Sequence, residues 1–281
     1  MIRLLHIIII NFIFCLGIES ISLPNNALEI AGANSGIGNS QNIGLNFSNL
    51  NNAKNSINIS SILWYQDIKG GNIEYKWGQK IHHYLNLYNL SANDIDLRYL
   101  TPTEDPINTF DVHHVSLAYG IGTNFSNNIR MGIKSTFIYN QLYVDESVGY
   151  NFDLGISYDY NQLMSIGMIL NQLGFEKNNN SSIQYPLLTG IGVTFNLKPL
   201  YSKIHSDILY NQSFSDEVTF KISSDTQFSY LNIITGYHYS NSKNEFSCGL
   251  SFKYRKIQFD YGISFHKALG TPIIFSLKYH I

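Results

Sequence analysis

The chain has 281 residues, of which only 14% are charged, and its formal net charge is −2. Soluble domains carry roughly 25% charged residues, and a near-neutral chain without a basic stripe offers no electrostatic footprint for nucleic acid. The 20 tyrosines and 17 phenylalanines suit a barrel in lipid, where amphipathic rings lie at the two water interfaces.

Residues 1–20 are predicted to form a secretory signal peptide. Arg3 supplies a positive charge, residues 4–18 are apolar, and Gly17 or Ser20 is a small residue near a possible cleavage point. A short membrane anchor is the alternative, although the apolar stretch is below the ~18 residues that a spanning helix needs. Removal of the peptide would leave a single cysteine, so no intramolecular disulfide is expected.

From about residue 56 onward, apolar and polar residues alternate in segments separated by turn residues. In DLGISYDY (153–160), for example, Leu154, Ile156 and Tyr158 share one face. A period of two indicates a strand with one apolar and one polar face. A soluble sandwich buries the apolar face, whereas a membrane barrel turns it toward lipid.

The alternation predicts about 14 strands, and single-chain bacterial barrels have an even number. Tilted strands of about 9–11 residues can cross a bilayer. The predicted strands are 56–65, 71–79, 83–100, 112–123, 129–144, 149–159, 163–173, 187–197, 201–210, 217–223, 228–240, 244–254, 257–266 and 272–281.

The lengths of the connections distinguish the two architectures. A barrel whose ends both face the periplasm has long loops after odd-numbered strands and short turns after even-numbered ones. The longest linkers, 101–111 and 174–186, follow the third and the seventh predicted strands, while the connections after even-numbered strands are brief. A sandwich has no reason to show this parity. The fold class is therefore predicted to be all-β, a transmembrane antiparallel β-barrel, with the apolar face of 153–160 toward lipid.

The last predicted strand, TPIIFSLKYHI, runs to the final residue. One of its faces carries Ile273, Phe275, Leu277, Tyr279 and Ile281. An alternating terminal strand with a final hydrophobic residue is typical of outer-membrane barrels, although the usual last residue is phenylalanine. The chain is accordingly predicted to reside in the outer membrane of a Gram-negative bacterium, in contact with lipid.

Residues 27–50, ALEIAGANSGIGNSQNIGLNFSNL, resemble the N-terminal segment of the PorV/PorQ family, which belongs to the FadL-like outer-membrane barrels. NFSNL (46–50) departs from the family's Asn-Pro-Ala-Gly-Leu motif at the Pro, Ala and Gly positions. Segments 152–174, 185–210 and 259–279 are similar to later strand pairs, so the resemblance covers roughly 27–281. The family's Ala-Leu-x-Met-Gly-Gly-Ala start is matched by Ala27, Leu28, Ala31, Gly32 and Ala33.

The resemblance implies a 14-stranded barrel (56–281) with an N-terminal hatch (21–55) inside the lumen. A lumen of that width needs filling, since it would otherwise leak water and solutes. A flexible linker is the alternative for the segment rich in glycine and asparagine at 31–44. The residues that we expect to form the hatch contacts are Leu28, Gly32, Asn46, Phe47 and Leu50.

The resemblance also implies a non-enzymatic role in type IX secretion, with secreted or surface proteins as partners. The outer loops would make the contacts, through Glu104, Asp105, Phe110, Glu176, Lys177 and Tyr185. The alternative is a FadL-like channel for hydrophobic small molecules, which needs an apolar pocket behind the hatch. The inward-facing residues are mostly polar or small, which argues against that alternative. A barrel with a structural role is a third interpretation.

No catalytic or cofactor motif is recognisable. The pairs His82-His83 and His113-His114 cannot each chelate one metal ion, because neighbouring residues of a strand point to opposite faces. Inward-pointing charged residues are expected to hydrate the lumen or to pair across strands, and these are Asp153, Asp159, Lys134 and Lys278. We therefore predict no metal ion, no cofactor and no enzymatic activity.

Overall fold

The structure is a computed structural model that describes residues 19–41, 43–97, 105–178, 181–212, 217–266 and 270–281. Residues 1–18 of the predicted signal peptide and Glu104 lie outside these ranges. The described strands are β1 (Ser56–Leu63), β2 (Lys69–Gly78), β3 (Ile81–Leu97), β4 (Asn108–Asn124), β5 (Ile129–Leu142), β6 (Asp145–Asp159), β7 (Met164–Asn178), β8 (Ser182–Gln184), β9 (Leu187–Leu197), β10 (Ser202–Gln212), β11 (Glu217–Phe228), β12 (Leu231–Tyr239), β13 (Asn244–Tyr254), β14 (Ile257–Phe265) and β15 (Ile273–His280).

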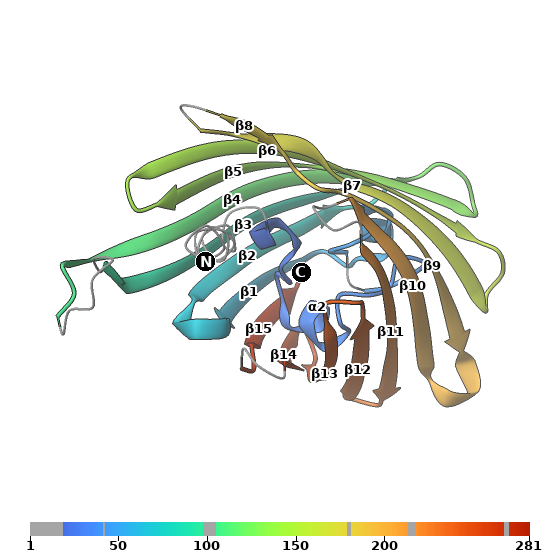
Figure 1. Cartoon of the computed structure of the whole chain (residues 1–281). Coiled ribbons are helices and arrows are strands. Elements are labelled where there is room, and N and C mark those ends of the chain that lie inside the picture. The colour runs from blue at the N-terminus through green and yellow to red at the C-terminus, as the bar shows by residue number, and fades with distance from the viewer. Residues whose placement is uncertain (1–18, 42, 98–104, 179–180, 213–216, 267–269) are drawn as a thin grey trace.

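The strands form a closed antiparallel barrel (Figure 1). Each strand pairs with its neighbours in sequence, and β1 closes the ring by pairing with β15, so that Ser56 lies opposite His280. β7 pairs with β9 inside the ring, while the short β8 pairs only with the far end of β7. The ring in the described chain therefore has 14 strands, and the predicted fold class is confirmed.

The connections have the predicted parity. We call the end at which Ser56 meets His280 the turn end and the opposite end the loop end. The turn end carries connections of two to four residues, at 79–80, 125–128, 160–163, 198–201, 229–230 and 255–256. The loop end has short connections too, such as 143–144, but every connection of five or more residues lies there, including 98–107 and 179–186. Both are shorter than predicted because β4 and β7 continue past the expected strand ends.

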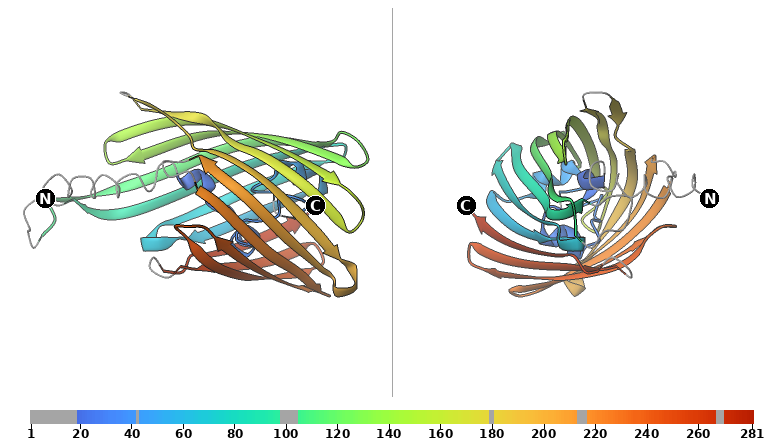
Figure 2. Two further views of the ribbon diagram at one scale, coloured as in Figure 1. Left: turned by 45° about the vertical axis from the view of Figure 1, so that its right-hand side comes forward. Right: turned by 60° about the vertical axis from the view of Figure 1, so that its left-hand side comes forward.

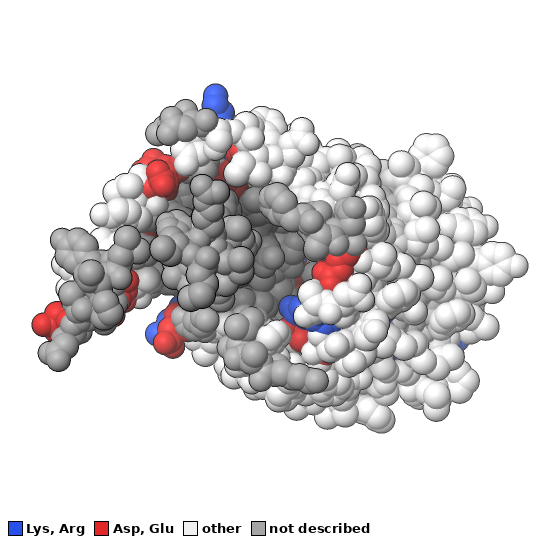
Figure 3. Space-filling view, in the orientation of Figure 1, with Lys and Arg blue, Asp and Glu red and all other residues white. Residues whose placement is uncertain are grey.

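The outward face of the barrel is apolar and the inward face is polar, the reverse of a soluble protein. In DLGISYDY the outward Leu154, Ile156 and Tyr158 are 38%, 39% and 44% exposed, while the inward Asp153 and Ser157 are 5% and 1% exposed. The same reversal repeats around the ring, and the broad face in Figure 3 carries almost no charged side chain. Exposed apolar area on this scale far exceeds the few hundred Å² that water-soluble monomers tolerate. Lipid is therefore the medium that fits this surface.

The N-terminal segment lies inside the barrel (Figure 2). It contains the short helices η1 (Glu19–Ser22), α2 (Ala27–Ala31) and η2 (Phe47–Asn52). α2 contacts β12 to β15 on one wall, whereas η2 contacts β3 to β6 on the opposite wall. We call residues 19–55 the hatch segment. Two further short helices, η3 (Tyr65–Asp67) and η4 (Lys198–Leu200), belong to connections between strands. Among the described residues, no helix combines the length and apolar character needed to cross a bilayer.

Candidate functional site

Asn26 fixes α2 against the barrel wall. Its side-chain oxygen accepts a hydrogen bond from the backbone N–H of Glu29 at 3.1 Å, which caps the first turn of the helix. Its Nδ2 group donates to carboxylate oxygens of Glu29 and Glu74, at 2.9 and 3.0 Å. The backbone N–H of Ala27 donates to Ser276 Oγ at 3.0 Å. One asparagine thus shapes the helix and joins it to strand β2.

Asn46 has the corresponding role for η2 and is completely buried. Its Oδ1 atom accepts from the backbone N–H of Ser48 at 3.0 Å and so caps η2. Its Nδ2 group donates to the carbonyl of Ile37 at 2.6 Å and to Ser157 Oγ at 3.0 Å. Asn46 therefore ties two parts of the hatch segment to strand β6. A buried amide with these partners is costly to replace by an apolar residue.

Two charged side chains of the wall hold the middle of the hatch segment. The Asp207 carboxylate on β10 accepts from the backbone N–H groups of Gly36 and Ile37, at 2.6 and 3.2 Å. Arg130 on β5 donates to the carbonyl of Gly38 at 3.3 Å and pairs with Asp159 at 2.8 Å. These bonds satisfy backbone groups that have no partner in a helix or a strand, as buried backbone requires.

Inward-facing glycines mark where the hatch segment meets the wall. A Cβ atom on Gly132 would lie 2.4 Å from the backbone of Phe47, and one on Gly262 would lie 2.2 Å from the carbonyl oxygen of Ala27. Both distances are below any real contact, so side chains at these positions would displace the hatch segment. The wall glycines with comparably close hatch atoms are Gly120, Gly132, Gly155, Gly167, Gly192, Gly236, Gly249 and Gly262.

The structure places the residues that we expected to form the hatch contacts as follows. Gly32, Asn46, Phe47 and Leu50 are buried, and Leu28 is half-buried. Phe47 meets Tyr84 edge-to-face at 5.2 Å between ring centroids. The wall residues that hold the hatch segment, notably Asp207 and Arg130, were not predicted from the sequence. Glycines recur at inward positions of the strands, and their places in the sequence could have indicated which parts of the wall the hatch segment contacts.

Two ion pairs of inward charged residues join neighbouring strands, which is one of the two roles that we expected for such residues. Lys134 on β5 lies 2.7 Å from Asp153 on β6, and Arg130 pairs with Asp159. Lys278 has no ion pair within the described part of the chain. No group of histidine, cysteine, aspartate and glutamate side chains suitable for a metal ion is found among the described residues.

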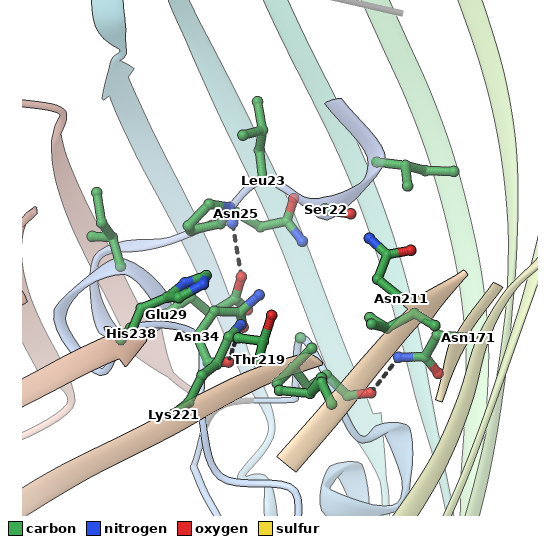
Figure 4. Close-up of a pocket in the computed structure, with 18 of the residues that line it drawn as sticks. Ser22, Leu23, Asn25, Glu29, Asn34, Asn171, Asn211, Thr219, Lys221 and His238 are labelled. Atoms are coloured by element: carbon green, nitrogen blue, oxygen red, sulfur yellow. Dashed lines mark hydrogen bonds between the residues drawn. The ribbon is translucent and has the colours of Figure 1, made fainter. Parts of the chain in front are cut away.

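A cavity of about 280 Å³ lies between the hatch segment and the loop end (Figure 4). Its lining includes apolar residues such as Leu23, Ile30 and Trp64. It also includes polar and charged residues, of which Lys221 and His238 point into the cavity from β11 and β12. Lys221 Nζ donates to the carbonyl of Asn34 at 3.2 Å and has no carboxylate within ion-pair distance in the described structure. The cavity can therefore take a small molecule with an apolar part and an anionic or polar part.

A second cavity, of about 380 Å³, lies toward the turn end. Its lining is almost entirely polar and includes Asn39, Asp159 and Lys203. The hatch loop, described at 36–41 and 43–46, lies between the two cavities: Asn39 lines the second, and Gly44 and Leu45 line the first. In that loop Ile37 and Leu45 pack with Leu209 and Ile169 of the wall. A solute that passes from one cavity to the other must displace this packed loop.

The residues predicted as outer-loop contacts that the structure describes lie at the loop end, though not all in loops. Phe110 lies on β4, Glu176 and Lys177 lie on β7, and Asp105 is exposed. Tyr185 is only 5% exposed, and its hydroxyl donates to Glu176 at 3.2 Å. As placed, Tyr185 and Glu176 stabilise the connection between β7 and β9 and offer little surface to a partner.

The protonation of Glu29 should make hatch docking sensitive to pH. Burial, reinforced by the nearby Glu74 carboxylate, raises the pKa of Glu29 to about 7. Between its unfolded value and 7, the docked state holds a proton that the undocked state has lost, so docking weakens as pH rises through this window. Hydrogen exchange of the α2 amides should therefore be faster at about pH 8 than at about pH 5.5, after correction for intrinsic rates. In Glu29→Gln this difference should disappear, whereas greater protection at the higher pH would contradict the assignment.

Comparison with known proteins gives structural matches only. No family model matches the sequence, and no curated protein does either. The toluene transporter TodX of P. putida is similar in structure, with a TM-score of 0.71 and 10% identity over 91% of this chain and 98% of that one. CymD, a monoaromatic hydrocarbon channel, gives a TM-score of 0.66 and 10% identity over 90% and 96% of the two chains. A Pseudomonas aeruginosa FadL homologue gives 0.57 and 9% identity over 92% and 99%.

These matches show a FadL-like barrel fold, as the resemblance in the sequence implied at that level. They carry no specific support for the PorV/PorQ branch of such barrels.

Proposed function

We propose that this protein is a non-enzymatic outer-membrane channel for small amphipathic molecules. The observation that carries the proposal is the cavity behind the loop end, which joins apolar residues such as Trp64 and Ile30 to the inward Lys221. A barrel closed by a hatch segment, with one cavity on each side, is suited to stepwise passage. The similarity to barrels described as hydrocarbon channels supports the apolar half of the ligand, and the polar wall adds an anionic or hydrogen-bonding half.

The proposal is tested by binding, with toluene and p-toluenesulfonate as probes that share a ring and differ by an anionic group. Trp64 lines the cavity, so its fluorescence in a Trp77→Phe background should report occupancy. We expect p-toluenesulfonate to bind more tightly than toluene, by roughly tenfold, as a charge-assisted bond to Lys221 would give. Lys221→Met should abolish this preference and leave toluene binding intact.

Thr219→Val is the matched control, because Thr219 lies two residues along the same strand and lines the same cavity. It should leave the preference unchanged. Equal affinity for the two probes in the unmodified protein would overturn the amphipathic specificity, and failure of both to bind would overturn the channel proposal.

Anchoring of protein partners at the surface, as in type IX secretion, is the second candidate. The observation that favours it is the extension of β3 and β4 to Leu97 and Asn108, well beyond the neighbouring loop at 64–68. Asp105 and Lys177 are exposed at this end and are the proposed contacts that best suit a partner. Loss of surface proteins that share a C-terminal domain, in cells lacking this protein, would support this function. An unchanged surface and secreted proteome would exclude it.

A further inference from the structure

The exterior of the barrel is not a uniform apolar belt. A groove of about 510 Å³ crosses its outer face near the turn end. The groove is lined by outward side chains of β1 and β12 to β15, including Ile59, Leu231, Leu250, Phe252, Phe259 and Leu277. An acyl chain is long, flexible and apolar, and a concave apolar groove gives it more contact area than the flat surface beside it.

Two cations stand at the end of this groove. The turn at 255–256 joins β13 to β14, and Phe252 pairs with Phe259 just before that turn. The Arg255 guanidinium lies 5.4 Å from the Tyr254 ring, and Lys256 Nζ lies 5.9 Å from the Tyr279 ring. Both tyrosines point outward and are about half exposed. The two cationic groups therefore lie over the outer surface of the barrel, beside the groove.

The charges of the two ends differ in sign. The connections of the turn end, all of which the structure describes, contain Lys80, Lys198, Arg255 and Lys256 and no aspartate or glutamate. Acidic side chains gather instead at the loop end, at the left of Figure 3. Short turns face the periplasm in barrels of this kind, so the cations lie at the headgroup level of the inner, phospholipid leaflet. An anionic headgroup complements them.

We propose that this groove and its two cations form a binding site for an anionic phospholipid of the periplasm-facing leaflet. One acyl chain lies in the groove over Leu250 and Phe252, and the phosphate contacts Arg255 and Lys256. The site faces the bilayer, so its occupancy does not depend on the solute route through the lumen.

The full chain, purified in a non-ionic detergent, can be examined by native mass spectrometry with equal amounts of phosphatidylglycerol and phosphatidylcholine that carry the same acyl chains. Phosphatidylglycerol should be retained preferentially. Arg255→Gln combined with Lys256→Gln should lower its retention roughly 25-fold, to the level of phosphatidylcholine, because each basic residue contributes about fivefold near an anionic headgroup. The matched control is Lys80→Gln combined with Lys198→Gln, at turns outside the groove, and it should change nothing.

Two further experiments distinguish a site that also binds an acyl chain in the groove from a site that binds the phosphate alone. Leu250→Trp, an outward substitution that fills the groove, should reduce retention of both lipids. Glycerophosphoglycerol, which has the headgroup and no acyl chains, should fail to compete. Equal retention of both lipids by the unmodified protein, equal losses in the control double variant, or full competition by glycerophosphoglycerol would each overturn the proposal.

Discussion

Gly132→Val is expected to open the barrel to ions without unfolding it. A Cβ at this position would lie 2.4 Å from the backbone of Phe47, so η2 must leave its place on β4 to β6. Overpacking of this kind costs about 1–3 kcal/mol, which raises the undocked fraction of the hatch segment roughly 5- to 150-fold. Single-channel recording in planar bilayers should show frequent ion-conducting openings that the unmodified barrel lacks.

Gly71→Val is the control for this substitution. Gly71 lies on an outward position of β2, and a Cβ there would meet no atom closer than 3.4 Å. It should therefore conduct like the unmodified protein. A folded Gly132→Val barrel that stays closed would show that the hatch segment does not depend on this contact.

Asn46→Leu is expected to loosen the whole loop between α2 and η2. The change removes the cap of η2 and leaves the carbonyl of Ile37 and the hydroxyl of Ser157 without this donor. Leaving buried groups unsatisfied costs about 1–3 kcal/mol each, so we expect a loss of about 2–4 kcal/mol of docking free energy. Hydrogen exchange of amides at 36–49 should accelerate roughly 30- to 1000-fold.

Asn52→Leu is the matched comparison, since Asn52 is exposed and its Nδ2 group donates to Asn39 Oδ1 at 3.1 Å on the surface. Asn52→Leu should hardly change the rate of hydrogen exchange in the loop. If both substitutions accelerate exchange equally, the buried amide of Asn46 is not what holds the loop.

The barrel itself could be predicted from the sequence because its signals are local. A period of two in DLGISYDY places Leu154 and Ile156 on one face and Asp153 on the other. A few neighbouring residues are enough to show which face of a strand a side chain is on, because successive side chains point to opposite faces. The parity of the connections then decided that the apolar face meets lipid, and the exposed fractions of these residues agree.

Strand ends were harder to predict than strands. The seventh strand was expected to stop at 173, with a linker beginning at Gly174. In the structure, β7 continues to Asn178, and the missing side chain of Gly174 leaves room for the carbonyl oxygen of Tyr150 on the next strand. The adjoining β8 was not predicted, because its three residues, Ser182–Gln184, are all exposed and carry no alternation.

The contacts that hold the hatch segment could not be predicted, because their partners are far apart in the chain. Gly36 binds a carboxylate 171 positions away, and Asn46 binds a hydroxyl 111 positions away. No local pattern encodes such pairs. The cavity has the same origin, since Trp64 and Lys221 come together only when the ring closes. The inward residues of the strands are mostly polar, and the hatch segment adds apolar residues such as Leu23 and Ile30 to the lining of the cavity.

The central claim is that small amphipathic anions cross the lumen and that the hatch segment must move to let them pass. Efflux of labelled p-toluenesulfonate, a permanent anion, from proteoliposomes tests it most directly. Ser48 of the hatch segment and Ser157 of β6 have their hydroxyl oxygens 2.6 Å apart, so Ser48→Cys with Ser157→Cys, in a Cys248→Ser background, should form a disulfide that ties the hatch to the wall. Ser202 of β10 and Thr226 of β11 lie on two adjacent strands of the wall, with their hydroxyl oxygens 2.9 Å apart, and cysteines at these two positions give a cross-link that spares the hatch.

We predict efflux through the reduced hatch-to-wall variant, its loss on oxidation, and continued efflux through the wall cross-link in both states. Undiminished efflux with the hatch segment covalently tied would contradict the claim.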